Sequence, residues 1–235
     1  QLSRDGIRRA VKLHGRSVEI DPGFALGWAA LASTRIAQAF FGHEPAAEVL
    51  PRARQEAGRA IALDPRVGVA WGAVGYIALY FDWDFEVARR NLERALELSP
   101  TDLMIRHAYA DYLLVTGRVE ESLEQALVGR RYDPLWEPSR AILLYHALMA
   151  RRYGLVVEEG RRMAAHLEDR PVLHDWVGRA LWLQGRHEEA LAEWRIAWGA
   201  AGGDGYRSFE AAYREAGARA ALAAHGEWLA GGAGG

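Results

Sequence analysis

The sequence contains no cysteine among its 235 residues. This absence excludes disulfide bonds, thiolate metal sites and cysteine nucleophiles. Neither sign of charge is in clear excess, because 29 basic residues stand against 31 acidic ones and leave a formal net charge of −2. Nucleic-acid-binding domains usually carry a clear basic excess. We therefore do not expect the chain to bind nucleic acid directly.

Long hydrophobic runs are absent too. The longest uncharged run covers residues 67–81, which is short of the roughly 20 residues that a membrane-spanning helix needs. The charged residues among the first nine leave no apolar segment of the kind that a signal peptide requires. We expect a cytoplasmic protein with no membrane partner. The chain begins with Gln1 instead of Met, which suggests a fragment excised from a larger protein.

Catalytic signatures are missing as well. The chain has no Walker loop, no Gly-x-Ser-x-Gly elbow, no dinucleotide-binding glycine motif and no His-Glu-x-x-His. His107 and Asp111 are spaced to share one face of a helix, which suits a metal pair. No third ligand is evident at a matching offset, so we interpret them as a polar pair. We expect no enzyme activity, no cofactor and no metal site.

What the sequence does contain is a repeat. A proline closes an Ala-rich stretch again and again, with a wide first gap and then a nearly constant spacing, at Pro22, Pro65, Pro100 and Pro134. Gly117 and Gly185 are separated by two of these shorter periods. Each glycine is expected in a turn between two helices, where a positive φ is wanted. A fixed period in the thirties is typical of stacked helical hairpins.

This register divides the chain into repeating units. Five units are expected at 25–67, 68–102, 103–136, 137–170 and 171–204, with a lone helix at 7–20, capping helices at 205–230 and a flexible tail at 231–235. The eighth position of a unit, where two helices cross, is small in four units and breaks the rule only at Leu144. Trp28, Trp71 and Trp194 fall at core positions. Trp83 falls in a turn, and we expect it to pin that turn against a neighbour rather than to be exposed to a partner.

The repeats resemble tetratricopeptide repeats (TPR) over residues 7–200. The matching segments include residues 60–65 and 95–100, and the Asp82-Trp83-Asp84 turn is the more specific piece. The resemblance is to the TPR regions of bacterial adenylate cyclases, winged-helix transcriptional regulators and serine/threonine kinases. It implies an all-α, right-handed superhelical solenoid of antiparallel helix pairs. About five repeats, a partial leading repeat and C-terminal capping helices would compose it.

In the fold that this resemblance implies, the first helix of each pair lines a concave groove. The corresponding positions here are Tyr76, Tyr80, His107, Asp111, Tyr145, Met149, Asp175, Arg179 and Trp182. These side chains are largely aromatic and apolar, and only Arg179 could clamp a peptide carboxylate. Tyr, Trp and Met are common in protein interfaces, so an apolar helix or an extended peptide is the expected ligand.

The function expected is therefore that of a non-enzymatic scaffold or sensory module that binds a protein or peptide, within a bacterial signalling or transcription-regulatory protein. Two alternatives remain open. One is self-association as a homodimer through Trp83 or the terminal helix. The other is a small-molecule or enzymatic site around His107, Asp111 and Tyr145. The groove could also be filled by the chain's own terminal helix.

Overall fold

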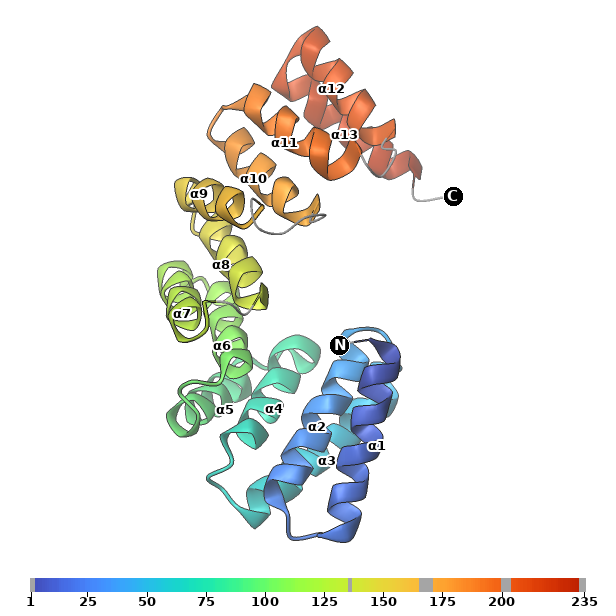
Figure 1. Ribbon diagram of the computed structural model, residues 1–235, viewed down its shortest axis with the longest axis vertical. Helices are drawn as coiled ribbons and strands as arrows, with labels where there is room; N and C mark the ends of the chain where they lie inside the picture. Colours follow the sequence, from blue (N-terminus) through green and yellow to red (C-terminus); the bar gives the residue numbers. More distant parts are fainter. Residues whose placement is uncertain (1–2, 135–136, 165–170, 200–203, 233–235) are drawn as a thin grey trace. The chain divides into compact units, whose positions relative to one another are not determined.

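The computed structural model describes residues 3–134, 137–164, 171–199 and 204–232, and Figure 1 shows their arrangement. Within these ranges the regular secondary structure is helical throughout, which confirms the predicted all-α class. Two compact units divide the chain at Ser139 and Arg140. The elements are α1 (Arg4–Ile20), α2 (Ala25–Phe40), α3 (Ala46–Leu63), α4 (Gly68–Ile77), the π-helical turn η1 (Ala78–Asp82), α5 (Phe85–Leu98), α6 (Leu103–Val115), α7 (Val119–Tyr132), α8 (Glu137–Met149), α9 (Tyr153–Ala164), α10 (Pro171–Leu183), α11 (His187–Gly199), α12 (Asp204–Ala216) and α13 (Ala218–Gly232).

The first unit is a row of helical hairpins, each packed against the next. The helix α2 contacts α1, α3 and α4, and α4 in turn contacts α5 and α6. Small side chains allow this close approach: Ala32, Ala53 and Ala57 are fully buried in one cluster with Ile77. Helix starts coincide with the expected starts of the units, at Ala25, Gly68, Leu103, Glu137 and Pro171.

The recurring proline has a structural partner shortly after it, at the start of the next helix. The indole Nε1 of Trp28 donates a hydrogen bond to the carbonyl oxygen of Pro22 at 3.0 Å. In the next repeat, Trp71 donates to Pro65 at 2.9 Å. Arg106 fills the same place in the third and donates to the Pro100 carbonyl. Trp28 and Trp71 are half-buried. Trp28 packs on the buried cluster of Ala29, Ala60 and Ala70, so it borders the core where full burial was expected.

Where the two helices of a hairpin cross, a glycine on one helix lies against a bulky side chain on the other. A Cβ added to Gly75 on α4 would lie 2.7 Å from the Cγ of Leu92 on α5, and one added to Gly178 on α10 would lie 2.5 Å from Nε1 of Trp194 on α11. In the fourth hairpin the bulky Leu144 stands at the crossing position of α8. A Cβ added to Gly160 on α9 would clash with Cγ2 of Val177 on α10 and would lie 3.8 Å, an ordinary contact distance, from Cδ1 of Leu144. Leu144 is fully buried.

Four turns repeat one backbone conformation. Trp83, Gly117, Arg151 and Gly185 all have positive φ values, of 58°, 83°, 55° and 77° respectively, and each lies one repeat period after the one before. The Trp83 side chain is 69 % exposed, and the ring contact recorded for it is an edge-on one with Phe85, at 6.4 Å between centroids. The prediction that Trp83 pins its turn against a neighbour was wrong.

The second unit is built around aromatic rings. Trp194 is buried, as predicted. Its ring lies 5.5 Å from Trp182 of α10 and 5.4 Å from Phe209 of α12, measured between centroids. Helix α12 therefore packs on the last hairpin as a cap, and α13 packs on α12.

Some expectations fall on parts of the chain that are not described. Residues 200–203, at the end of the fifth expected unit, and 233–235 of the expected tail lie outside the described residues. Helix α13 extends through Gly232, beyond the expected start of that tail. Among the described residues, no helix combines the length and the apolar character needed to cross a bilayer.

Candidate functional site

Three aromatic rings from three different elements meet in the first unit. Phe40 ends α2, Tyr76 lies on α4 and Tyr80 lies in η1. The two tyrosine rings are 4.3 Å apart, and Phe40 is edge-on to both at 5.9 and 6.2 Å, measured between centroids. Edge-to-face packing at such distances is a favourable arrangement of aromatic rings. Phe40 is nevertheless 52 % exposed, so part of this aromatic surface faces solvent.

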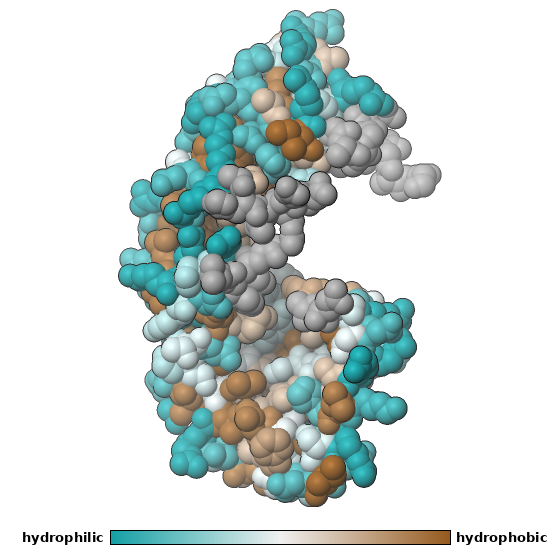
Figure 2. Space-filling view, viewed as in Figure 1, coloured by the Kyte–Doolittle hydropathy of each residue, from teal (hydrophilic) through white to brown (hydrophobic). Residues whose placement is uncertain are grey.

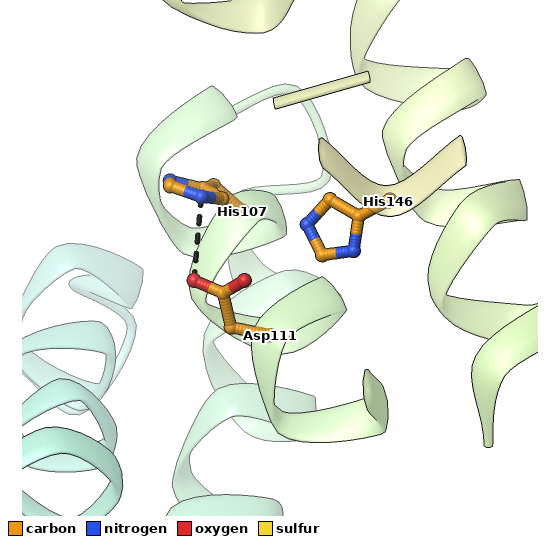
Figure 3. A group of neighbouring side chains, drawn as sticks. All are labelled: His107, Asp111 and His146. Carbon is orange, nitrogen blue, oxygen red and sulfur yellow. Dashed lines mark ion pairs between the residues drawn. The ribbon is translucent and has the colours of Figure 1, made fainter. Parts of the chain in front are cut away.

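A carboxylate borders these rings. The hydroxyl of Tyr80 donates a hydrogen bond to Oδ2 of Asp111 on α6. Nε2 of His107, one turn earlier on α6, lies 3.3 Å from the same oxygen (Figure 3). The third side chain drawn in that figure, His146, belongs to α8 of the second unit. We call Phe40, Tyr76, Tyr80, His107 and Asp111 the aromatic–acid cluster.

The electrostatics of the cluster disfavour an additional negative charge. Burial raises the pKa of the Tyr76 hydroxyl, and the nearby charge of Asp111 raises it further. Tyr76 is therefore a neutral phenol at physiological pH. The side chain of Asp111 is itself only 16 % exposed, so its field is screened less than that of a surface carboxylate.

Tyr76 and Tyr80 are four residues apart on the continuous helical segment of α4 and η1, so their side chains share one side. Helix α4 widens into the π-helical turn η1 before the chain reverses at Trp83, and the amide of Asp84 donates to the carbonyl of Ala78 at 3.0 Å. Single π-helical turns occur often at functional sites. An ion pair between Arg54 of α3 and Asp82, 2.6 Å apart, ties this turn to the preceding hairpin.

The structure thus brings together four of the nine expected groove residues. Sequence reasoning missed Phe40, because the position lies past the end of the repeat pattern of its unit. The signal was the wide first gap between prolines, from Pro22 to Pro65, which places extra residues around Phe40, Phe41 and His43. Phe41 is edge-on to Phe40 at 5.3 Å and stacks on His43 at 6.0 Å, measured between ring centroids.

The other five expected residues lie in the second unit. Tyr145 is edge-on to Trp176 with 5.8 Å between the ring centroids, and Asp175 forms an ion pair with Arg179 at 2.8 Å. Met149 is 42 % exposed.

Trp182 contacts the chain's own capping helix. Its ring lies 5.2 Å from Phe209 and 5.6 Å from Tyr213, both on α12, measured between centroids. Helix α12 thus covers part of a side chain that we expected to line an open groove.

Apolar side chains also reach the surface elsewhere. Figure 2 shows hydrophobic groups among hydrophilic ones over the part of the molecule that holds α1 to α4. The exposed apolar residues of this part include Leu13, Ile20, Phe24 and Leu26. Single exposed apolar side chains are common. What distinguishes the aromatic–acid cluster is that three rings and a hydrogen-bonded carboxylate converge.

The antiparallel hairpins, their near-constant period and the small residues at the crossings define a TPR fold. Solved structures with this fold are similar along almost the whole chain. One is PilF of Pseudomonas aeruginosa, with a TM-score of 0.65 and 13 % identity over 98 % of this chain and 95 % of that one. Another is PilW, a type IV pilus biogenesis factor, with a TM-score of 0.67 and 17 % identity over 90 % and 94 %.

A curated relative is more similar in sequence. The transcriptional regulator HilA of Salmonella typhimurium is 26 % identical over 195 residues, which are 81 % of this chain and 34 % of HilA. The chain therefore spans about a third of the length of the curated relatives that it matches. No family model matches the chain.

Proposed function

We propose that this chain is a non-enzymatic protein-interaction module that binds a peptide or a helix of a partner across α2, α4 and α6 of its first unit. The observation that carries the proposal is the aromatic–acid cluster. Phe40 leaves half of its apolar surface in water while its ring is held by Tyr76 and Tyr80. Aromatic side chains in such positions are typical anchors of protein interfaces.

The similarity to HilA supports a role in regulation. HilA is a transcriptional regulator, and this chain matches about a third of it. We propose that the chain serves as the interaction region of a bacterial regulatory protein, in the cytoplasm, where transcription takes place. Direct contact with nucleic acid is not part of the proposal, because basic and acidic residues nearly balance.

Peptide selection tests the proposed surface. A random library of short peptides displayed on phage is selected on the immobilised chain, and the enriched peptides are measured by calorimetry. Phe40→Ala should weaken their binding about tenfold or more, as expected for a central anchor. Because Phe40 is largely exposed, the variant should retain the fold, which circular dichroism can check.

Leu26→Ala is the matched control. Leu26 is 51 % exposed, against 52 % for Phe40, and it lies near the other end of α2, about 20 Å away at a helical rise of about 1.5 Å per residue. Its removal should leave peptide binding unchanged. Peptides that bind Phe40→Ala as tightly as the parent chain would show that the ligand surface lies elsewhere.

A further inference from the structure

We infer that the aromatic–acid cluster accepts a basic side chain, arginine or lysine, that projects from an otherwise apolar segment of the partner. This inference rests on the proposed function and adds the chemistry of the residue recognised there. It follows from the aromatic rings, from the position of the carboxylate and from the charge that each presents to a ligand.

The rings supply faces that attract a cation. An aromatic face carries partial negative charge, so an ammonium or guanidinium group within about 6 Å of the ring centre is stabilised. The Tyr76 and Tyr80 rings are tilted by 41° and lie 4.3 Å apart, and Phe40 meets them at 72° and 73°. A guanidinium can stack on such surfaces with its planar face, which favours arginine over lysine.

The carboxylate supplies the complementary charge. Tyr80 donates its hydroxyl hydrogen to Oδ2 of Asp111, which fixes the carboxylate beside the rings. The field of Asp111 extends to Tyr76, where it adds to burial in raising the pKa of the phenol. An electrostatic field that disfavours a negative charge on the Tyr76 hydroxyl favours a positively charged ligand group beside it.

The same charges disfavour the opposite ligand. An acidic side chain or a peptide C-terminus placed over these rings would meet the ring faces and Asp111 with like charge. The nearest basic group identified in the cluster is His107, whose Nε2 is already 3.3 Å from Asp111. The segment around the basic side chain should be apolar, because Phe40 and Phe41 are 52 % and 43 % exposed beside the cluster.

The test uses the peptides that depend on Phe40. Where such a peptide contains lysine, the lysine is first replaced by arginine. The arginine is then replaced by citrulline, which has nearly the same shape and no charge. The citrulline peptide should bind the parent chain about tenfold more weakly or worse, as expected when a hydrogen-bonded charge is lost. In Asp111→Asn the preference for the arginine peptide should fall to the few-fold that the rings alone supply, because the carboxylate is gone and the aromatic faces remain.

Two further variants complete the design. Glu210→Gln removes a carboxylate of similar exposure on α12, 18 % against 16 %, and should keep the full preference for arginine. Phe40→Leu keeps an apolar side chain but removes the ring. Because the site is exposed, the variant should retain the fold. It should reduce the preference for arginine about threefold, the size of an exposed cation–π interaction.

The outcomes separate this inference from the function on which it rests. Phe40-dependent peptides that lack arginine and lysine, or citrulline peptides that bind as tightly as the originals, would overturn the inference and leave the interaction surface in place. A preference for arginine that keeps its full size in both Asp111→Asn and Phe40→Leu would overturn it too. If the library yields no peptide that depends on Phe40, both proposals fall.

Discussion

At the scale of single residues, the turn conformation that recurs once per repeat carries an energetic cost in two places. A left-handed backbone brings Cβ close to a carbonyl oxygen and costs about 1–2 kcal/mol for residues other than glycine. Gly117 and Gly185 avoid that cost, whereas Trp83 and Arg151 occupy the same conformation with φ values of 58° and 55°. The fold specifies this turn strongly enough to hold unfavourable residues in it.

Replacing Arg151 by glycine should therefore stabilise the protein. The variant relieves the left-handed strain but adds freedom to the unfolded chain, so the expected gain is about 0.5 to 1 kcal/mol in the free energy of unfolding. Urea denaturation measures it. Gly117→Ala is the reciprocal control and should cost about 1 kcal/mol. Equal stability of Arg151→Gly and the parent chain would mean that the turn is not strained.

The same turns show what the sequence reveals at this scale. Gly117 and Gly185 indicated the left-handed position, because glycine is the residue that most readily adopts a positive φ. Trp83 gave no such signal, since an aromatic residue usually indicates packing, and the prediction of a buried contact was wrong for that reason. The position could have been found by moving one repeat period forward from Trp83, which reaches Gly117.

At the scale of the helical hairpin, the pair of residues at the crossing is complementary in size. Gly75 lies against Leu92, and Gly178 lies against Trp194. The helices can therefore approach closely in these two hairpins. Close packing of this kind leaves little room for an added methyl group.

A double-mutant cycle at Gly75 and Leu92 tests this complementarity. Gly75→Ala should cost about 1–3 kcal/mol through overpacking, and Leu92→Ala about 2–5 kcal/mol through the cavity that it leaves. In the double variant the new methyl group fills part of that cavity. Its loss of stability should be smaller than the sum of the two by about 1 kcal/mol or more.

Gly58→Ala is the control for a glycine in a helix. A Cβ at Gly58 in α3 meets nothing within 4 Å, so this variant should be stabilised by up to about 1 kcal/mol through helix propensity. Additive effects at Gly75 and Leu92 in urea denaturation would contradict a shared contact.

The sequence was informative about hairpins and less so about their partners. The spacing of Pro65, Pro100 and Pro134 predicted the helix starts, since a proline ends one helix and fixes where the next can begin. It could not show that Gly178 lies against Trp194, because that match is a contact between two helices. Of the aromatic–acid cluster, Tyr76, Tyr80 and Asp111 follow the repeat and could be named from the sequence. Phe40 comes from a segment that the period does not describe.

At the scale of the whole molecule, each unit is a row of helices in which each helix packs on the few helices beside it. In repeat proteins the stability is close to a sum of terms within repeats and between adjacent ones. In the first unit α4 contacts α2, α3, α5 and α6, and in the second α10 contacts α9 and α11. A local defect should consequently weaken the hairpin that carries it and the elements beside it, in contrast to a protein with a single central core.

Hydrogen exchange measured by mass spectrometry can test this on two matched defects. Gly178→Ala places a methyl group against the rigid indole of Trp194, so amide protection should fall in α10 and α11. It should also fall in α12, because Trp194 contacts Phe209 there. Protection in α2 to α5 should stay at the level of the parent chain. Gly75→Ala should give the reverse pattern, since its added methyl group meets Leu92 within the first unit.

Separate and cooperative opening of the units predict different patterns of exchange. If the units open separately, a destabilised hairpin exchanges through its own local opening, and distant amides keep their own opening free energies. If the whole chain opened in one cooperative step, either variant would speed the exchange of the most protected amides in both units equally. That uniform loss of protection would contradict an effect confined to the hairpin that carries the defect and the elements beside it. Binding of a peptide at Phe40 should by the same logic raise protection in α2, α4 and α6 first, which would place the ligand within the first unit.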